Sequence, residues 1–275
     1  MKKIFSLVLI VAMTFGIMMA FAGCGKTDAP VSNVSNDGKL ICGVTIYEPM
    51  NYKDASGAWT GFDTEFAQLV GEKLEMDVEF QEIEWKSKYS ELAAGTINCI
   101  WNGFTANSED EGKKRSELVD FSHSYMLNQQ CVVVKAADAD NYKDIESLAG
   151  KTASAEKGSA GEPVAKEAIG DSGKMIDSPS QVATLMEVKS GAVDFVVIDI
   201  LLAQKLTGTG NYSDLAIADI ELESEVYAVG FKKGSDLTVK VNAAIKELFE
   251  EGKMEELAKK YNLENSLVLD VDFKG

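Results

Sequence analysis

The sequence predicts an α/β protein made of two α/β units and a C-terminal return. Three observations predict it. Short apolar runs, typical of buried strands, alternate with segments of helical periodicity, which indicates parallel sheets flanked by helices. This alternation occurs twice, over 39–104 and 130–199, and a strand with a strongly amphipathic segment follows over 225–261. The chain of 275 residues is long enough for more than one compact domain.

The first unit, over 39–104, alternates between strand-like apolar runs and segments of helical periodicity. Phe62, Phe66, Val70 and Leu74 recur at helical spacing, and Asp63 or the threonine after it can cap that helix. A shorter helix is expected to end at a glycine that follows it. We expect strands over 39–45, 78–83 and 97–104, and helices over 62–74 and 89–94.

The second unit repeats the alternation. Pro163 suits the first turn of a helix, because proline lacks the amide hydrogen that this turn leaves unpaired. Beyond the unit, Glu251-Gly252 interrupts the last amphipathic segment, which is therefore expected to form two helices. We expect strands over 130–135, 151–155, 193–198 and 225–232, and helices over 142–148, 163–169, 179–190 and 237–261.

The N-terminus has the features of an export signal. Lys2 and Lys3 precede an uncharged apolar run over 4–22, and Phe21-Ala22-Gly23-Cys24 resembles the lipobox of bacterial lipoproteins, with Phe where Leu is usual. We predict a lipoprotein signal peptide over 1–23, lipid on Cys24 and a polar, flexible tether over 24–37. The alternative is a permanent membrane-spanning anchor. Both place the folded body outside the cytoplasm, at the outer face of the cell membrane.

Charge and composition exclude several classes of protein. The net charge is -17, and without Lys2 and Lys3 it is 25 minus 44, or -19, so nucleic acid is not an expected partner. A single histidine leaves little for a histidine-based metal site or a catalytic triad, and no cofactor is expected. Cys42, Cys99 and Cys131 are predicted to be buried free thiols; a Cys42–Cys99 bridge is the alternative.

Several motifs appear together in an order typical of one family. From Lys39 to Asn262 the chain resembles the polar amino acid solute-binding proteins of ATP-driven (ABC) importers, family 3 of the extracellular solute-binding proteins, in lipoprotein form. The motifs lie at Tyr47–Tyr52, Gly61-Phe62-Asp63, Trp85, Asn102–Thr105, Val119–Ser122, Gly158-Ser159-Ala160, Val193–Asp199 and Tyr227–Asp236.

The resemblance implies a two-lobed, periplasmic-binding-protein-like (type II) fold. Two strand crossings, over 124–129 and 223–227, would connect the lobes. Residues 38–124 and 228–275 would form a discontinuous first lobe, and residues 130–223 the second. Ligand would bind in the cleft between them.

Arg115 is the candidate for the ligand carboxylate. It is the single arginine of the chain and lies five residues before Asp120, the offset at which the family places its carboxylate-binding arginine. Guanidinium matches a carboxylate better than ammonium does. The stretch over 106–114 is longer than the family pattern, so an exposed surface charge is the alternative.

Other ligand-binding residues follow from the resemblance. Thr105 would assist through its amide and hydroxyl, and Ser159 and Ala160 would donate from a helix start. Asp199 ends an apolar strand, where open α/β sheets place ligands, and would accept the ammonium group.

The remaining candidates concern the ammonium group and the ligand side chain. Tyr47 and Trp85 would sandwich the side chain, although aromatic residues are more often part of the core. The carbonyls of Asn102 and Gly103 could accept from the ammonium group. Glu48 would either bind a basic or amide side chain of the ligand or face water.

The leading hypothesis is therefore a binding protein, not an enzyme. It would capture a polar or charged free amino acid as a monomer and deliver it to the permease subunits of an importer. One alternative is an enzyme, because dehydratases use the same fold; GSAG at 158–161 is not a G-x-S-x-G nucleophile motif. Another is a sensory ectodomain.

Overall fold

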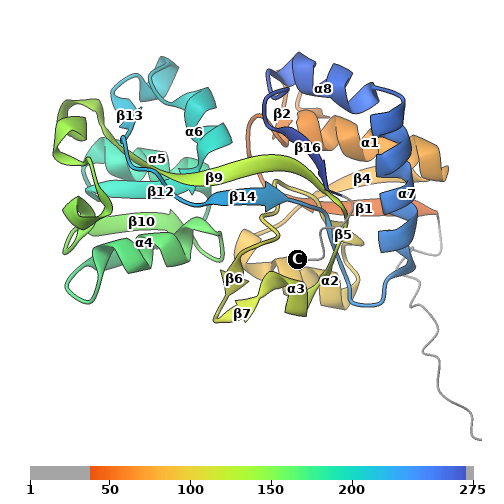
Figure 1. Ribbon diagram of the computed structural model, residues 1–275, viewed down its shortest axis with the longest axis horizontal. Helices are drawn as coiled ribbons and strands as arrows, with labels where there is room; N and C mark the ends of the chain where they lie inside the picture. The colour runs from red at the N-terminus through yellow and green to blue at the C-terminus, as the bar shows by residue number, and fades with distance from the viewer. Residues whose placement is uncertain (1–37, 271–275) are drawn as a thin grey trace, which may run out of the picture.

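The computed structural model describes residues 38–270. Two lobes, each with its own sheet, lie side by side (Figure 1), which confirms the predicted two-lobed α/β class. The predicted signal peptide, Cys24 and the tether fall outside the described residues. Within those residues, no helix has both the length and the apolar character that crossing a membrane requires.

The first lobe is built on a sheet in the order β4-β1-β5-β15-β8. β1 pairs in parallel with β4 and β5, while β15 pairs antiparallel with β5 and β8. The elements are β1 (Lys39–Val44), β4 (Asp77–Glu82), β5 (Cys99–Ile100), β8 (Asp120–Phe121), β15 (Gly230–Phe231), and the helices α1 (Phe62–Leu74), α2 (Lys88–Ala94), α7 (Asp236–Glu250) and α8 (Lys253–Tyr261). The hairpin β2 (Tyr52–Lys53) with β3 (Trp59–Thr60) precedes α1.

The second lobe is built on a sheet in the order β11-β10-β12-β9-β13. β10 pairs in parallel with β11 and β12, and β12 and β13 pair antiparallel with β9. The elements are β9 (Ser124–Lys135), β10 (Thr152–Glu156), β11 (Lys174–Ser178), β12 (Phe195–Asp199), β13 (Leu215–Ile217), and the helices α4 (Gly161–Ile169), α5 (Gln181–Ser190) and α6 (Ile200–Leu206).

Long strands run between the two lobes. β9 is twelve residues long, and its first part pairs antiparallel with β14 (Ser224–Tyr227). The expected crossings over 124–129 and 223–227 fall in this paired ribbon, which Figure 1 shows between the lobes. β16 (Leu267–Asp270) also pairs with β9 and was not expected. The exact lobe boundaries stay a prediction.

Local differences from the predicted elements have physical causes. The strand expected over 97–104 is only Cys99–Ile100, and Gly103, at φ 53°, lies in the bend that follows it. The helix expected over 142–148 is a short 3₁₀ helix, Ile145–Leu148, capped by the Asp144 carboxylate. The short elements α6, β11 and β13 were missed.

Asp63 does not cap α1, contrary to expectation. Gly61 occupies the cap position, and no side chain caps the helix. The Asp63 carboxylate is instead buried, and its Oδ2 accepts from the Gly103 amide at 2.6 Å and the Tyr125 hydroxyl at 2.9 Å. Burial raises the pKa of Asp63 to about 7, against these two hydrogen bonds, which lower it.

Cys42, Cys99 and Cys131 are buried free thiols, as predicted. Cys42 and Cys99 are direct partners on β1 and β5, and their sulfur atoms lie 3.6 Å apart.

Candidate ligand-binding site

A small cavity lies between the lobes. Its volume of about 10 Å³ is about what a single water molecule requires. The first lobe contributes its lining through residues of 85–115, and the second through residues of 156–199. The lining residues are Trp85, Asn102, Gly103, Thr105, Arg115, Glu156, Ser159, Ala160, Gln181 and Asp199. Eight of the predicted site residues are thus brought together, and Tyr47 and Glu48 are not among them.

Strand ends position most of these side chains. Asn102 and Gly103 follow β5, Glu156 ends β10 and Asp199 ends β12. β10 and β12 are parallel neighbours, so their carboxyl ends, with Glu156 and Asp199, meet at one edge of the sheet. Ser159 lies in the turn before α4. The cavity therefore occupies the edge where α/β sheets place ligands.

Arg115 is buried at the cavity, so the surface alternative is wrong. Its side chain is 1% exposed and lies over the Phe104 ring. Its Nη1 donates to the Thr105 carbonyl at 2.9 Å. The longer stretch folds into a hairpin, β6 (Glu109–Asp110) with β7 (Lys113–Lys114), directly before α3 (Arg115–Leu118). This hairpin leaves Arg115 at the cavity.

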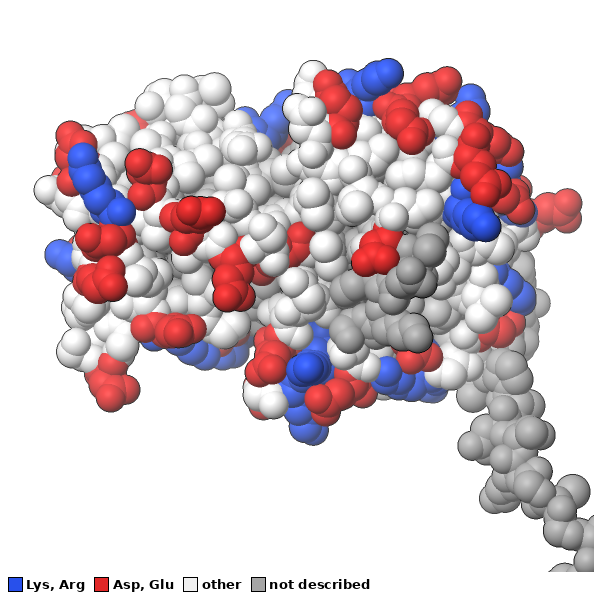
Figure 2. All heavy atoms as spheres, viewed as in Figure 1, with Lys and Arg blue, Asp and Glu red and all other residues white. Residues whose placement is uncertain are grey.

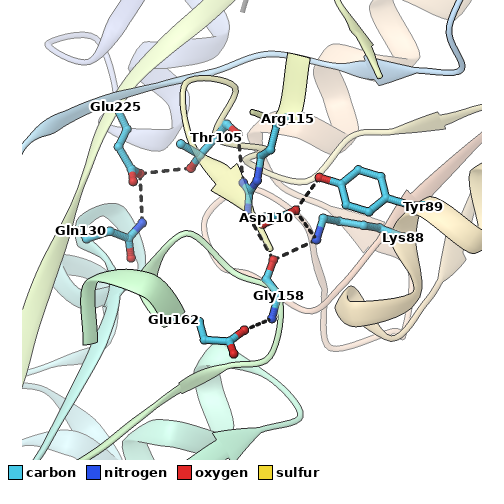
Figure 3. A network of polar contacts seen from close by, with 9 residues as sticks. All are labelled: Lys88, Tyr89, Thr105, Asp110, Arg115, Gln130, Gly158, Glu162 and Glu225. Carbon is cyan, nitrogen blue, oxygen red and sulfur yellow. Dashed lines mark hydrogen bonds and ion pairs between the residues drawn. The ribbon is translucent and has the colours of Figure 1, made fainter. Parts of the chain in front are cut away.

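Asp110 on this hairpin lies between two cations (Figure 3). Its Oδ1 is 3.0 Å from Arg115 Nη2 and its Oδ2 is 3.1 Å from Lys88 Nζ. Burial opposes ionisation of Asp110, but Arg115 and then Lys88 outweigh it and hold its pKa below the usual value. Burial, with the Arg115 charge beside it, lowers the pKa of Lys88 to about 8. One carboxylate therefore serves two cations.

The same two cations reach across to the second lobe. Lys88 Nζ donates to the Gly158 carbonyl at 2.9 Å, and Arg115 Nη2 donates to the same oxygen at 3.2 Å. Figure 3 shows both bonds converging on Gly158. These contacts hold the lobes together.

Acidic groups gather on the other side of the cavity. Asp199 Oδ1 accepts from Asn128 Nδ2 at 2.6 Å and Gln130 Nε2 at 2.7 Å, and Gln181 donates to Oδ2. The same two amides donate to Glu225 Oε2, each at 2.9 Å. Burial raises the pKa of Asp199 despite these donors. Burial and the Asp199 charge raise the pKa of Glu225 to about 7.

Three polar atoms of the lining side chains are buried without a hydrogen-bond partner among residues 38–270. They are Arg115 Nε, Ser159 Oγ and Glu156 Oε1. Buried polar groups are nearly always paired in native proteins. Unpaired donors on two of these residues and an unpaired carboxylate oxygen at the same cavity therefore fit a ligand that carries both kinds of polar group.

Two predicted residues, Tyr47 and Glu48, do not line this cavity. The Tyr47 hydroxyl is 2.6 Å from the Tyr227 hydroxyl, and the Tyr47 side chain is buried in the core. Glu48 forms an ion pair with Lys205 of α6 at 3.4 Å. Trp85 lines the cavity and also a larger hollow of about 410 Å³, bordered by Glu84 and Lys157 among others. The predicted sandwich of the ligand side chain between Tyr47 and Trp85 stays a prediction.

Sequence reasoning missed several residues of the site. Glu156 ends β10 as Asp199 ends β12, so the strand-end rule could have found it. Lys88, Asp110 and Gln181 carried no signal in the sequence, because only the fold brings them to Arg115 and Asp199.

The buried carboxylates predict how stability depends on pH. The pKa is raised to about 7 in Asp63 and Glu225, and burial with the Asp199 charge raises it to about 8 in Glu156. Their stabilising contribution is complete below the unfolded values, near 4, and is lost as pH rises through 7 and 8. We expect the unfolding temperature of the free protein to fall by roughly 5 °C or more between pH 5 and pH 8.

A pair of variants checks this expectation by calorimetry. Glu156→Gln should flatten the fall, whereas Glu167→Gln, which alters an exposed carboxylate of α4, should leave it unchanged. An unfolding temperature that stays constant or rises over this range would contradict the assignment.

The fold and the cavity define a class: two-lobed proteins that enclose a small polar ligand at the facing ends of two sheets. The model of the bacterial extracellular solute-binding proteins, family 3, matches residues 40–264, and the chain belongs to this family. The arginine-binding extracellular protein ArtP of Bacillus subtilis is 28% identical over 95% of this chain and 98% of its own.

Two solved structures are similar to the chain. An ancestral arginine-binding protein bound to arginine has a TM-score of 0.75 at 29% identity, covering 82% of this chain and 98% of its own. The ancestral amino acid-binding protein AncCDT-1, described as a precursor of cyclohexadienyl dehydratase, has a TM-score of 0.72 at 27% identity, covering 82% and 95%. The chain is thus an amino-acid-binding type of solute-binding protein.

Proposed function

We propose that this protein captures a polar or charged amino acid outside the cytoplasm and delivers it to the permease of an ABC importer, without catalysing a reaction. The observation that carries the proposal is the placing of Arg115 and Asp199, from different lobes, on one interlobe cavity. A free amino acid carries a carboxylate and an ammonium group, and these residues offer one partner to each.

The carboxylate would bind on the side of Arg115. Arg115 Nε and Ser159 Oγ are buried donors without a partner in the described chain, and both belong to side chains that line the cavity. The amides of Thr105 and Ala160 would add donors, as the resemblance implies. Anions are favoured at such a helix start because its amides are unpaired.

The ammonium group would bind on the side of Asp199. The side-chain amides of Asn128, Gln130 and Gln181 already donate to this carboxylate and hold it in place. Asp199 lines the cavity, so an ammonium group held there would add a charged partner to these neutral donors. The carbonyls of Asn102 and Gly103 would accept its other hydrogens.

Binding requires the lobes to separate. A cavity of about 10 Å³ is too small for an amino acid, so the lobes would open, admit the ligand and close around it. The paired strands over 124–129 and 223–227 are the proposed hinge. The contacts that must break on opening include those of Lys88 and Arg115 with the Gly158 carbonyl.

The proposed location is the outer face of the cell membrane, with the monomeric body attached through lipid on Cys24. On the face in Figure 2, acidic side chains are spread over both lobes, in keeping with the net charge of -17. Such a surface does not cling to anionic lipid, so an anchor is needed. Cys24→Ser should move the protein from the membrane fraction to the soluble fraction of lysed cells. Retention of the variant in the membrane would contradict lipid anchoring.

A thermal-shift screen of the purified protein tests the function. It would cover the twenty amino acids with cystine and ornithine. A ligand at about 100 times its dissociation constant should add roughly 2.7 kcal/mol of stability. A shift with one chemical group of amino acids supports the proposal. No shift with any of them contradicts it and favours the enzyme and sensor alternatives.

A further inference from the structure

We propose that Glu156 is a specificity-determining residue that selects amino acids with a cationic side chain, such as a guanidinium or an ammonium group. The inference rests on the proposed function and names the substrate class of the same site. Glu156 lines the cavity, is 3% exposed and has one carboxylate oxygen, Oε1, that is buried and unpaired among the described residues.

The position of Glu156 makes it available to a ligand. It ends β10, beside the strand that carries Asp199, and it precedes the turn that holds Ser159. No hydrogen bond or ion pair within residues 38–270 occupies Oε1. A buried carboxylate oxygen left without a donor is costly, and a cation in the cavity would remove that cost.

The charges that line the cavity are unbalanced. Arg115 is the single cation of the lining, against the carboxylates of Glu156 and Asp199. Arg115 and Lys88 share Asp110, so this group of three carries one net positive charge. A bound amino acid would place its carboxylate against this group and its ammonium against Asp199. Glu156 would then remain unmatched, and a positive side chain would neutralise it.

Proton linkage follows from the same arrangement. The charged groups that act on Glu156 are Asp199, which favours its protonated form, and Lys88 and Arg115, which oppose it. Burial is the largest influence and raises the pKa of Glu156 to about 8. Near neutral pH a cationic side chain must therefore displace a proton, whereas a neutral side chain need not.

Pairs of amino acids that differ mainly in the charge of the side chain test the inference. The dissociation constants of L-arginine and L-citrulline, and of L-lysine and L-norleucine, would be measured by calorimetry at about pH 6.5 and pH 8.5. In the better-bound pair, the cationic member should bind about tenfold or more tightly. This preference should increase with pH, because ionised Glu156 becomes more abundant.

Variants separate recognition from stability. Glu156→Gln keeps the shape of the side chain and should reduce the preference to about threefold or less and make it independent of pH. Glu167→Gln changes an exposed carboxylate of the same lobe and should leave the preference unchanged. A purely structural role for Glu156 would alter the affinity for both members of a pair equally.

Some results would overturn the inference alone, and others would overturn the proposed function as well. If the neutral member binds equally or more tightly, or if Glu156→Gln keeps the preference, the inference is overturned while the proposed function stands. If no amino acid of the pairs or of the screen binds, the proposed function fails as well.

Discussion

Replacing Arg115 with alanine should weaken amino-acid binding by roughly 2–5 kcal/mol, about thirtyfold to a few thousandfold. The variant removes the guanidinium that would face the ligand carboxylate. Its Nε is buried without a partner in residues 38–270, and its side chain lines the cavity. Calorimetric titration with the amino acid that gives the largest thermal shift would measure the loss.

Controls are needed because Arg115 also makes structural contacts. It bonds the Thr105 and Gly158 carbonyls and pairs with Asp110, so the unfolding temperature of each variant must be compared without ligand. Arg115→Lys keeps the charge but loses the planar fork, and should recover only part of the affinity. Lys113→Ala, an exposed lysine of the same hairpin, should bind normally. Wild-type affinity in Arg115→Ala would refute its proposed role.

Replacing Asp199 with asparagine should weaken binding about a hundredfold or more, because the ligand ammonium loses its charged partner. The amide has a similar shape, but its NH₂ would face the Gln181 donor that now bonds the carboxylate. The same titration measures the change. Asp194→Asn, an exposed position before the other end of β12, is the matched control.

The stability of Asp199→Asn distinguishes a binding role from a structural one. Burial raises the pKa of Asp199, so its ionised form disfavours the free, closed protein at high pH. The unfolding temperature of the variant should therefore fall less between pH 5 and pH 8 than that of wild type, while the variant binds ligand poorly. A variant that binds as well as wild type would argue against the ammonium site.

Much of the fold could be predicted from local sequence patterns. The apolar spacing of Phe62 to Leu74 predicted α1, and Glu251-Gly252 predicted the break between α7 and α8. Elements without a clear local sequence pattern were not predicted. β16 pairs with β9 across more than 130 residues of chain, a long-range contact that no local periodicity contains.

The site residues likewise include some that could be predicted from local sequence and some that could not. Asp199 and the turn around Ser159 could be placed because strand ends and helix starts are local features that meet at one edge of a sheet. Asp110 could not, because its role depends on how the hairpin folds back onto Arg115. Tyr47 differs from these: its motif is local, but its hydroxyl pairs with Tyr227, 180 residues away, and its role in binding stays a prediction.

The central claim is that the cavity recognises both charged groups of an amino acid. Calorimetry would compare the best amino acid of the screen with its N-acetyl derivative and with the amine that lacks its carboxylate. We expect one-to-one binding of the amino acid and a loss of about a hundredfold or more for each derivative. Equal affinity for either derivative would contradict the roles assigned to Arg115 and Asp199.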